Sequence, residues 1–317
     1  MRARPVTADL SCPACRQSSV RRLWALPAFP EELEATWRAA EISPGSLFAC
    51  SYCSLRFRSP TPPEARLLTA YESMSVESSW VHGERPLWHT MRRLMDRAPG
   101  RSVLDVGCFR GDFLAWLGGG WERFGIEPSP EGQRASQARG VTILGSNVTS
   151  FEPGKARFAV ITLVDVVEHL PHPLDVLERL SLALVPGGSL LVFTGDTEAM
   201  TWRLAGRHYW YSLLPEHVVF LSSSWFRWAA PRLGCHIDTL RRLAHSPKGV
   251  QASIDEAIKN VVWIALRRLG DAGGSRFPVA RLPLLGRMAQ RKAAWWTTAR
   301  DHILVQLVRN SDDELER

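Results

Sequence analysis

The sequence predicts an α/β protein with a mostly parallel sheet and a small N-terminal metal-binding module. From residue 101 onwards, short apolar runs alternate with amphipathic helical segments, and this alternation builds a parallel sheet covered by helices on both faces. Two C-x-x-C pairs precede these elements, and such pairs are typical of zinc sites. The length of 317 residues suits one large domain with a small appendage.

The apolar runs place the strands of the predicted sheet. Five runs come first: Ser102–Val106, Arg123–Ile126, Val141–Leu144, Phe158–Val164 and Ser189–Thr194. Helices are expected before, between and after them: Pro63–Met74, Glu84–Ala98, Asp112–Leu117, Pro130–Arg139, Pro173–Leu184 and Trp225–Leu233. We expect Pro186-Gly187-Gly188 to end the helix before the fifth strand. Two later strands are expected at Cys235–Leu243 and His302–Val308.

The expected domains follow from this order. They are a zinc-knuckle module at 1–62, a helical connection at 63–100, a core at 101–245, a helical insertion at 246–300, the last core strand at 301–310 and an acidic tail at 311–317.

Four of the six cysteines form the two pairs: Cys12, Cys15, Cys50 and Cys53. Two thiolates three positions apart on a turn can reach one Zn²⁺, and two such turns complete a tetrahedron with no open position. We therefore expect a structural zinc ion, with a helix at 31–41 between the pairs. Unrelated buried thiols or a single redox pair are the alternative interpretation. Cys108 and Cys235 lie in apolar strand contexts and are expected in the core.

The charge and the first residues of the chain indicate the compartment in which the protein works. The net charge is +7, and nearly all the basic residues are arginine, which suits phosphate or carboxylate partners unless it reflects genome composition. The first ten residues contain no apolar region of a signal peptide. No apolar run reaches the ~18 residues that a membrane span needs. We expect a cytoplasmic protein, where paired cysteines more often bind metal than form disulfides.

The loop after the first core strand predicts a nucleoside cofactor. It carries Asp105, Gly107 and Gly111, but a dinucleotide fingerprint would also need glycine at 109 and 112. No Gly-Lys-Ser/Thr follows, which excludes a P-loop. Glu127 ends the second strand, where a carboxylate can accept hydrogen bonds from both ribose hydroxyls. The alternative for Glu127 is a solvated acid at a strand end.

These residues match a known family. Val103–Gly111 resembles the first motif of class I S-adenosylmethionine-dependent methyltransferases, and Gly125–Pro130 resembles their second-strand motif. Leu163–Pro173 is similar to the fourth-strand motif of the ubiquinone-type branch. Further segments resemble the fifth motif, a later motif of that branch, and the zinc knuckle that precedes sugar-modifying methyltransferases: Leu184–Gly188, Pro215–His217 and Cys50–Pro60.

The resemblance covers roughly residues 10–243 and the last strand, and it implies a Rossmann-like seven-stranded sheet, mostly parallel, with an antiparallel last strand. It also implies a set of residues that bind S-adenosylmethionine. Asp105, Gly107 and Gly111 would hold its amino-acid end, Glu127 its ribose, and Asp165 would line the site. Ser146 and Asn147 would lie near the adenine. Neighbouring motif positions complete the expected site: Cys108, Phe109, Phe113 and Pro128. Phe109 departs from the family, which usually has glycine there, and a side chain could crowd the cofactor or point away from it.

Methyl transfer to a hydroxyl requires a base, and histidine suits that role at neutral pH. His169 follows the fourth strand and His217 lies in a later loop, so we expect one of them to be the base. Glu168 and Glu216 are their candidate partners. We expect His172 and His208 to be structural. The aromatic run 209–211 would either stack on a sugar or ring, or form a packed lid.

The predicted function is methyl transfer from S-adenosylmethionine to a hydroxyl or carbon of a saccharide, sugar nucleotide or other small molecule. One alternative is an RNA methyltransferase that uses its zinc module to contact RNA. It is disfavoured because Asp165–Glu168 stands where base-amino methyltransferases carry Asn/Asp-Pro-Pro-aromatic. Another alternative is a non-catalytic module, which only Phe109 favours.

The insertion at 246–300 combines apolar residues at helical spacing with flanking basic residues. The apolar positions include Ile254, Ile258 and Val261. An ordinary helical insertion, a substrate lid, a dimer face and peripheral contact with the inner membrane surface all fit this pattern.

Overall fold

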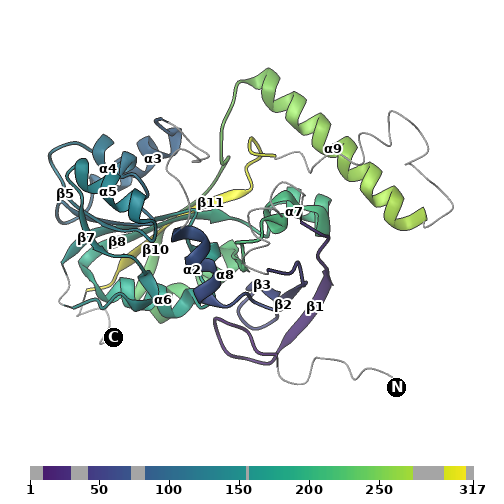
Figure 1. Ribbon diagram of the computed structural model, residues 1–317, viewed down its shortest axis with the longest axis horizontal. Helices are drawn as coiled ribbons and strands as arrows, with labels where there is room; N and C mark the ends of the chain where they lie inside the picture. The colour runs from purple at the N-terminus through teal and green to yellow at the C-terminus, as the bar shows by residue number, and fades with distance from the viewer. Residues whose placement is uncertain (1–9, 30–41, 73–82, 155–156, 274–295, 312–317) are drawn as a thin grey trace.

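A computed structural model describes residues 10–29, 42–72, 83–154, 157–273 and 296–311 (Figure 1). The helix expected at 31–41 and nearly all of the acidic tail lie outside the described residues. Among the helices described, none is both long enough and apolar enough to cross a membrane.

The main sheet has seven strands in the order β10-β11-β8-β7-β4-β5-β6. Their bounds are β4 Ser102–Val106, β5 Glu122–Ile126, β6 Thr142–Gly145, β7 Phe158–Val164, β8 Leu184–Gly195, β10 Cys235–Leu243 and β11 His302–Arg309. Neighbours from β6 to β8 are parallel, whereas β11 is antiparallel to both β8 and β10. The predicted fold class is therefore confirmed.

Helices lie on both faces of this sheet (Figure 1). The α-helices are α2 Glu64–Glu72, α3 Pro86–Met95, α4 Asp112–Trp116, α5 Pro130–Ala138, α6 Pro173–Leu182, α7 Met200–Ala205, α8 Ser223–Ala229 and α9 Val250–Gly273. Short 3₁₀ segments are η2 Val148–Ser150, η3 Val167–His169, η4 Gly206–His208, η5 Trp210–Leu213 and η6 Ala230–Leu233. Several helices begin at proline, as α3, α5 and α6 do, because proline fits a first helical turn that needs no N–H donor.

Most element boundaries differ by one to a few residues from the prediction, and two of these differences have a clear physical cause. The helix expected to reach Leu184 ends at Leu182, because Leu184 already pairs with Phe158 as the first residue of β8. The Pro-Gly-Gly stretch therefore lies inside β8, where a register shift accommodates it. The helix expected at Trp225–Leu233 is α-helical only to Ala229 and continues as η6, since Pro231 cannot donate a helical hydrogen bond.

The N-terminal module contains a second sheet, in the order β1-β2-β3-β9. Three strands come from the module: β1 Val20–Ala25, β2 Ser46–Cys50 and β3 Arg56–Ser59. The fourth, β9 (Val219–Phe220), comes from the range expected to be core and pairs antiparallel with β3. The fully buried Arg58 donates to four carbonyls, those of Pro44, Ser212, Leu214 and His217. Strand pairing and this guanidinium thus fix the module on the core.

Candidate cofactor and active site

The loop after β4 needs glycine at two positions. Gly107 has φ +74°, and a Cβ there would lie 2.7 Å from Cγ2 of Val166, just after β7. Gly111 has φ +72°, and its Cβ would lie 2.9 Å from Oγ of Ser136 on α5. Only glycine adopts this backbone without strain and allows such close approach. The loop therefore lies directly against the end of β7.

Phe109 keeps the backbone conformation that a glycine would take. Its φ is +47°, a left-handed conformation that costs a residue with a side chain about 1–2 kcal/mol. Two hydrogen bonds hold it there: its N–H donates to Oε2 of Glu127 at 2.8 Å, and its carbonyl accepts from Oγ of Ser136 at 2.7 Å. The departure from the family motif thus leaves the fold of the loop intact.

Glu127 is in position for a diol. It is 4% exposed, at the end of β5, and its Oε1 accepts from the N–H of Ser129 at 2.9 Å. Burial raises the pKa of this carboxyl, although the N–H groups of Ser129 and Phe109 lower it. Each carboxylate oxygen can accept a further hydrogen bond, so both can receive ribose hydroxyls.

Asp105 is a buried carboxyl beside the loop. It is 6% exposed, and it accepts from the hydroxyl of Thr162 at 2.6 Å. Burial raises its pKa to about 7. Cys108 and Phe113 are buried in the hydrophobic core below the loop, and Cys235 is buried elsewhere in the core, as expected.

The expected adenine segment follows β6. Ser146 is exposed, whereas the side chain of Asn147 caps η2 by accepting from the N–H of Thr149 at 2.8 Å. Asn147 also donates to Glu64 at 3.2 Å. A cavity of about 510 Å³ includes Asn147 but neither Glu127 nor the glycine loop, so it lies beside the expected cofactor position.

The expected catalytic residues gather in one cluster, the Glu168 group, comprising Glu168, His169 and His217. Their donor and acceptor atoms lie within 4.8 Å of one another, close enough to share a metal ion. Glu168 is fully buried and accepts from Thr194 Oγ1 at 2.9 Å and from the hydroxyl of Tyr211.

Hydrogen bonds engage both histidines of this group. Nδ1 of His217 lies 2.9 Å from the carbonyl of Tyr211, and Nδ1 of His169 lies 2.7 Å from the hydroxyl of Tyr71, on α2. The Glu168 group therefore lies between the core and the N-terminal part of the chain.

Burial keeps the Glu168 group close to neutral. It raises the pKa of Glu168 to about 7 and raises the pKa of Glu216. Burial also lowers the pKa of His169, and burial together with His169 lowers that of His217 well below its ordinary value.

A second cluster, which the sequence analysis missed, surrounds Asp165. We name Asp165, His245 and His302 the Asp165 group; their polar atoms also lie within 4.8 Å of one another. Oδ2 of Asp165 lies 3.2 Å from Nη1 of Arg85 and 3.4 Å from Nε2 of His245. Burial raises the pKa of Asp165, but His245 and Arg85 outweigh it and lower that pKa well below its ordinary value. The side chains of Asp165 and His245 are 26% and 20% exposed, so this group reaches solvent.

His302 is the buried member of the Asp165 group. Its Nδ1 lies 2.8 Å from Oδ1 of Asp301, and its ring stacks on Phe193 and Trp210 with centroids 5.3 and 6.0 Å away. Neither Nε2 of His302 nor Oδ1 of Asp165 has a hydrogen-bond partner among the described residues, although both atoms are buried. An imidazole oriented by a carboxylate, with its other nitrogen free, is the arrangement of a general base.

A signal for His302 existed in the sequence. The last strand is antiparallel to its neighbours, so its first residue lies at the edge where the parallel strands end. His302 opens that strand and pairs with Gly195 at the end of β8. Arg85 and His245 carry no comparable signal, because only the fold brings their segments together.

The remaining expected positions are structural. The aromatic run Tyr209, Trp210 and Tyr211 is buried in a hydrophobic cluster, so it packs and does not present a ring face to solvent. His208 is buried with its ring against Trp263. Nδ1 of His172 lies 3.2 Å from the carbonyl of Pro13 at the surface.

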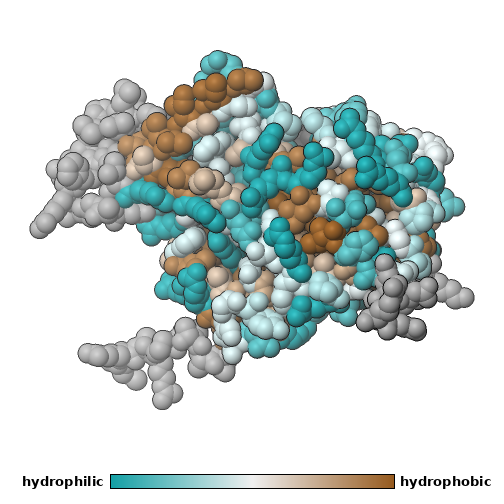
Figure 2. All heavy atoms as spheres, turned by 180° about the vertical axis from the view of Figure 1, so that it is seen from behind, coloured by the Kyte–Doolittle hydropathy of each residue, from teal (hydrophilic) through white to brown (hydrophobic). Residues whose placement is uncertain are grey.

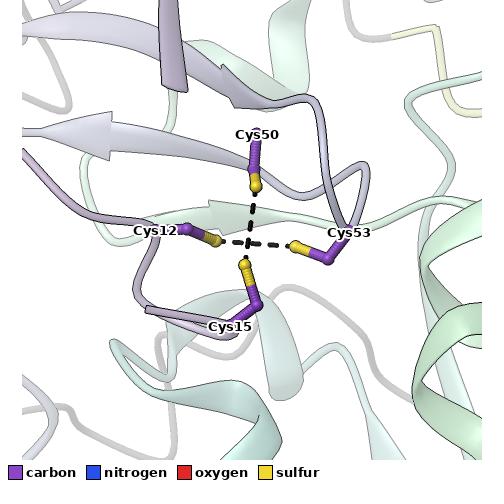
Figure 3. A group of neighbouring side chains, drawn as sticks. All are labelled: Cys12, Cys15, Cys50 and Cys53. Atoms are coloured by element: carbon purple, nitrogen blue, oxygen red, sulfur yellow. Dashed lines mark hydrogen bonds between the residues drawn. The ribbon is translucent and has the colours of Figure 1, made fainter. Parts of the chain in front are cut away.

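The four paired cysteines converge from two turns (Figure 3). Their sulfurs lie 3.5 Å apart in the pairs Cys12–Cys53 and Cys15–Cys50. Zinc–sulfur bonds of about 2.3 Å place tetrahedral sulfurs about 3.8 Å apart, so the four thiols fit a zinc ion. The hydrogen bond between Cys12 and Cys53 lowers the pKa of Cys12 to about 5 and raises the pKa of Cys53, because the two thiols share a proton.

Comparisons with known proteins agree with this architecture. A family model described as a methyltransferase domain matches residues 80–240. A ubiquinone biosynthesis O-methyltransferase from Ralstonia nicotianae is 24% identical over 226 residues, covering 66% of this chain and 87% of the relative. One from Thiobacillus denitrificans is 26% identical over 185 residues, covering 53% and 78%.

Solved structures are similar as well. A methyltransferase from Geobacter sulfurreducens in complex with S-adenosyl-L-homocysteine has a TM-score of 0.43 and 16% identity, covering 76% of this chain and 96% of that one. An S-adenosylmethionine-dependent methyltransferase from Mesorhizobium loti has a TM-score of 0.45 and 16% identity, covering 70% and 97%.

Proposed function

We propose that this chain, which belongs to the methyltransferase domain family and is an S-adenosylmethionine-dependent methyltransferase, methylates a hydroxyl group of a small molecule. The two relatives described above are O-methyltransferases, which supports oxygen as the acceptor atom. The likeness of the N-terminal knuckle to that of sugar-modifying methyltransferases supports a saccharide or sugar nucleotide as the acceptor.

In this proposal, the cofactor lies along the glycine loop and Glu127. Glu127 accepts hydrogen bonds from the ribose hydroxyls, while Gly107 and Gly111 let the backbone approach the amino-acid end closely. Asp165 would line the cofactor site, because the glycine loop lies against Val166 just after β7, where a Cβ on Gly107 would come within 2.7 Å of that side chain. When bound, S-adenosylmethionine supplies an electrophilic methyl group on a sulfonium.

The reaction is an in-line displacement, in which the protein mainly positions donor and acceptor. A bond forms between the acceptor oxygen and the methyl carbon as the carbon–sulfur bond breaks, and its electron pair passes to sulfur. The hydroxyl proton must pass to a base. The observation that carries the proposal is His302, whose Nε2 is free of partners among the described residues while Asp301 orients its ring.

We assign the base to His302, with Asp165 and His245 beside the acceptor. The earlier candidates His169 and His217 remain the alternative, with Glu168 or Glu216 as partner. Nδ1 of each of these histidines meets a hydroxyl or a carbonyl, and among the described residues no carboxylate hydrogen-bonds to either ring as Asp301 does to His302. Variants at His302 and His169 separate the two assignments, as set out in the Discussion.

Calorimetric titration with S-adenosylhomocysteine tests the cofactor site. Glu127→Ala should weaken binding about tenfold or more, because it removes the acceptor of two hydroxyl hydrogen bonds. Glu122→Ala, at the other, exposed end of β5, is the matched control and should bind normally. Equal binding by wild type and Glu127→Ala would refute the ribose contact.

Turnover tests the acceptor. Transfer of label from [methyl-³H]S-adenosylmethionine is measured with UDP-glucose, a sugar nucleotide, and with 3,4-dihydroxybenzoate, an aromatic diol. Label found in an acid-stable methyl ether of either probe supports O-methylation, and the probe that carries the label identifies the class of acceptor. Label on carbon would contradict the proposal.

We propose further that the four cysteines hold one structural Zn²⁺, which fixes the two turns of the module and leaves no open position for chemistry. Metal analysis of the purified protein should find one zinc per chain. Cys12→Ser should lose the zinc, whereas Cys235→Ala, which alters a lone buried thiol, should retain it.

A further inference from the structure

The surface formed by α7 and α9 is unusually apolar. Eight large hydrophobic side chains are exposed in the described part of the chain, and six of them lie on these two helices. On α9 they are Val250, Ile254, Ile258 and Val261, with 48–78% of each side chain exposed; on α7 they are Met200 and Leu204, at 69% and 41%. Figure 2 shows the apolar band along α9. We call these six residues the α7–α9 surface.

The opposite face of α9 is already occupied. Trp263 and Ile264 are buried in the same hydrophobic cluster as Trp202 of α7. The exposed stripe, spaced by three or four residues, therefore faces away from the core. A helix that is apolar on both faces needs a second partner.

Charge indicates what that partner is. Ten of the 39 lysines and arginines but only three of the 32 acids lie between residues 246 and 300. This stretch thus carries a net charge of +7, and the rest of the chain carries none. Five of the ten cations lie at 274–295, outside the described residues. Exposed cations border the stripe itself, namely Arg203, Lys259 and Arg268. Two acids lie near the stripe. Glu256 is engaged by Lys248 and by the backbone of Thr297 and Thr298, and the exposed Asp255 accepts from the side chain of Gln251.

We propose that the α7–α9 surface binds an anionic lipid membrane. An apolar helical stripe that enters the interface, flanked by cations that meet anionic headgroups, is the chemistry of a peripheral amphipathic helix. A second copy of this chain fits less well, because a symmetric dimer would bring two faces of the same positive charge together.

This contact bears on the acceptor site. His245 of the Asp165 group lies in the connection between β10 and α9, and the N–H of the next residue, Ser246, bonds to Thr297 just before β11. Four residues therefore separate His245 from Val250, the first residue of α9 and part of the α7–α9 surface, and an acceptor carried on a lipid would approach the Asp165 group along this connection. The binding itself does not depend on the identity of the acceptor.

Vesicle co-sedimentation tests the proposal. The full chain is mixed with vesicles of phosphatidylcholine alone, or of phosphatidylcholine and phosphatidylglycerol in equal parts. We expect binding to the anionic vesicles that is about tenfold or more stronger than to the neutral ones and that weakens with added salt. Absence of binding to anionic vesicles at low salt would overturn the proposal.

Variants locate the contact. Ile254→Glu with Ile258→Glu places carboxylates in the stripe and should reduce vesicle binding about tenfold or more, while titration with S-adenosylhomocysteine shows that the variant is folded. Leu182→Glu, at an exposed leucine on α6, is the matched control and should bind normally. Unchanged binding by the double variant would refute the assignment. If the wild type forms a dimer and the double variant does not, the surface binds a second copy of the chain, which would also refute the assignment.

Discussion

Two groups, each with one carboxylate and two histidines, lie at the same edge of the sheet, and their carboxylates are only three residues apart. The Glu168 group is the more enclosed in its hydrogen bonds: Glu168 and His217 are buried and His169 is partly exposed. Tyr71 and Tyr211 hydrogen-bond to it, and burial favours the neutral forms of its side chains. The Asp165 group is open, with Asp165 and His245 reaching solvent. The hydrogen bonds of a side chain therefore indicate better than its position in a sequence motif whether it is free to act on a substrate.

The difference arises from what covers each group. The N-terminal part of the chain lies over the Glu168 group through α2 and β3, so those residues join the module to the core. No strand or helix of that module that the structure describes covers the Asp165 group, which is bounded by Arg85 and by the connection to α9. We therefore predict that substitutions at the Asp165 group change turnover, whereas substitutions at the Glu168 group change the stability of the fold.

The largest expected effect is on turnover. His302→Gln should lower kcat/KM about 10²–10⁴-fold, because a positioned base contributes that factor, while S-adenosylhomocysteine still binds. Asp301→Asn should lower it in the same direction and shift the pH–rate profile. His172→Gln, at an exposed histidine, is the control. Full activity in His302→Gln together with a large loss of activity in His169→Gln would place the base in the Glu168 group instead.

The closed group should respond mainly in stability. Tyr211→Phe leaves Glu168 and the N–H of Gly195 without the hydroxyl that they share, and an unpaired buried group costs about 1–3 kcal/mol. Urea unfolding measures the loss. Tyr52→Phe, at a ring that is 55% exposed, should change little; an equal change in both variants would argue against the network.

Stability should also fall as the pH rises. Burial raises the pKa of Glu168 to about 7 from its ordinary 4.5, so the folded protein binds this proton more tightly than the unfolded chain does. The contribution is complete below the ordinary pKa and is lost as the pH rises through 7. In Glu168→Gln, the free energy of unfolding should therefore decline less steeply between pH 4.5 and about pH 7. Part of the decline should persist, because the pKa of Asp105 is raised in the same way. An unchanged slope would show that Glu168 stays ionised.

The smallest effect is expected at the rim of the module. Arg16 reaches Asp175 on α6 at 2.7 Å, but their side chains are 69% and 41% exposed. Arg16→Ala should therefore cost less than about 1 kcal/mol in urea unfolding. A larger loss would mean that surface ion pairs, rather than Arg58 and β9, hold the module in place.

Sequence patterns predicted the sheet and the convergence of the four cysteines, because strand alternation and ligand spacing are local signals. The antiparallel last strand was implied by the resemblance to the methyltransferase family. The place of Glu127 at the end of β5 was predicted for the same reason as the sheet, and its contact with ribose stays a prediction. Phe109 could not be judged from sequence, because its left-handed backbone depends on hydrogen bonds to Glu127 and Ser136. The Asp165 group escaped although His302 opens the last strand, because His245 and the neighbouring Arg85 come from segments that only the tertiary fold brings together.

The most direct test of the comparison is a crystal structure of the protein with S-adenosylhomocysteine. Our account predicts that the sulfur faces Asp165, His245 and His302, with both ribose hydroxyls on Glu127. A sulfur that faces His169 and His217, with the Asp165 group turned away from the cofactor, would contradict it.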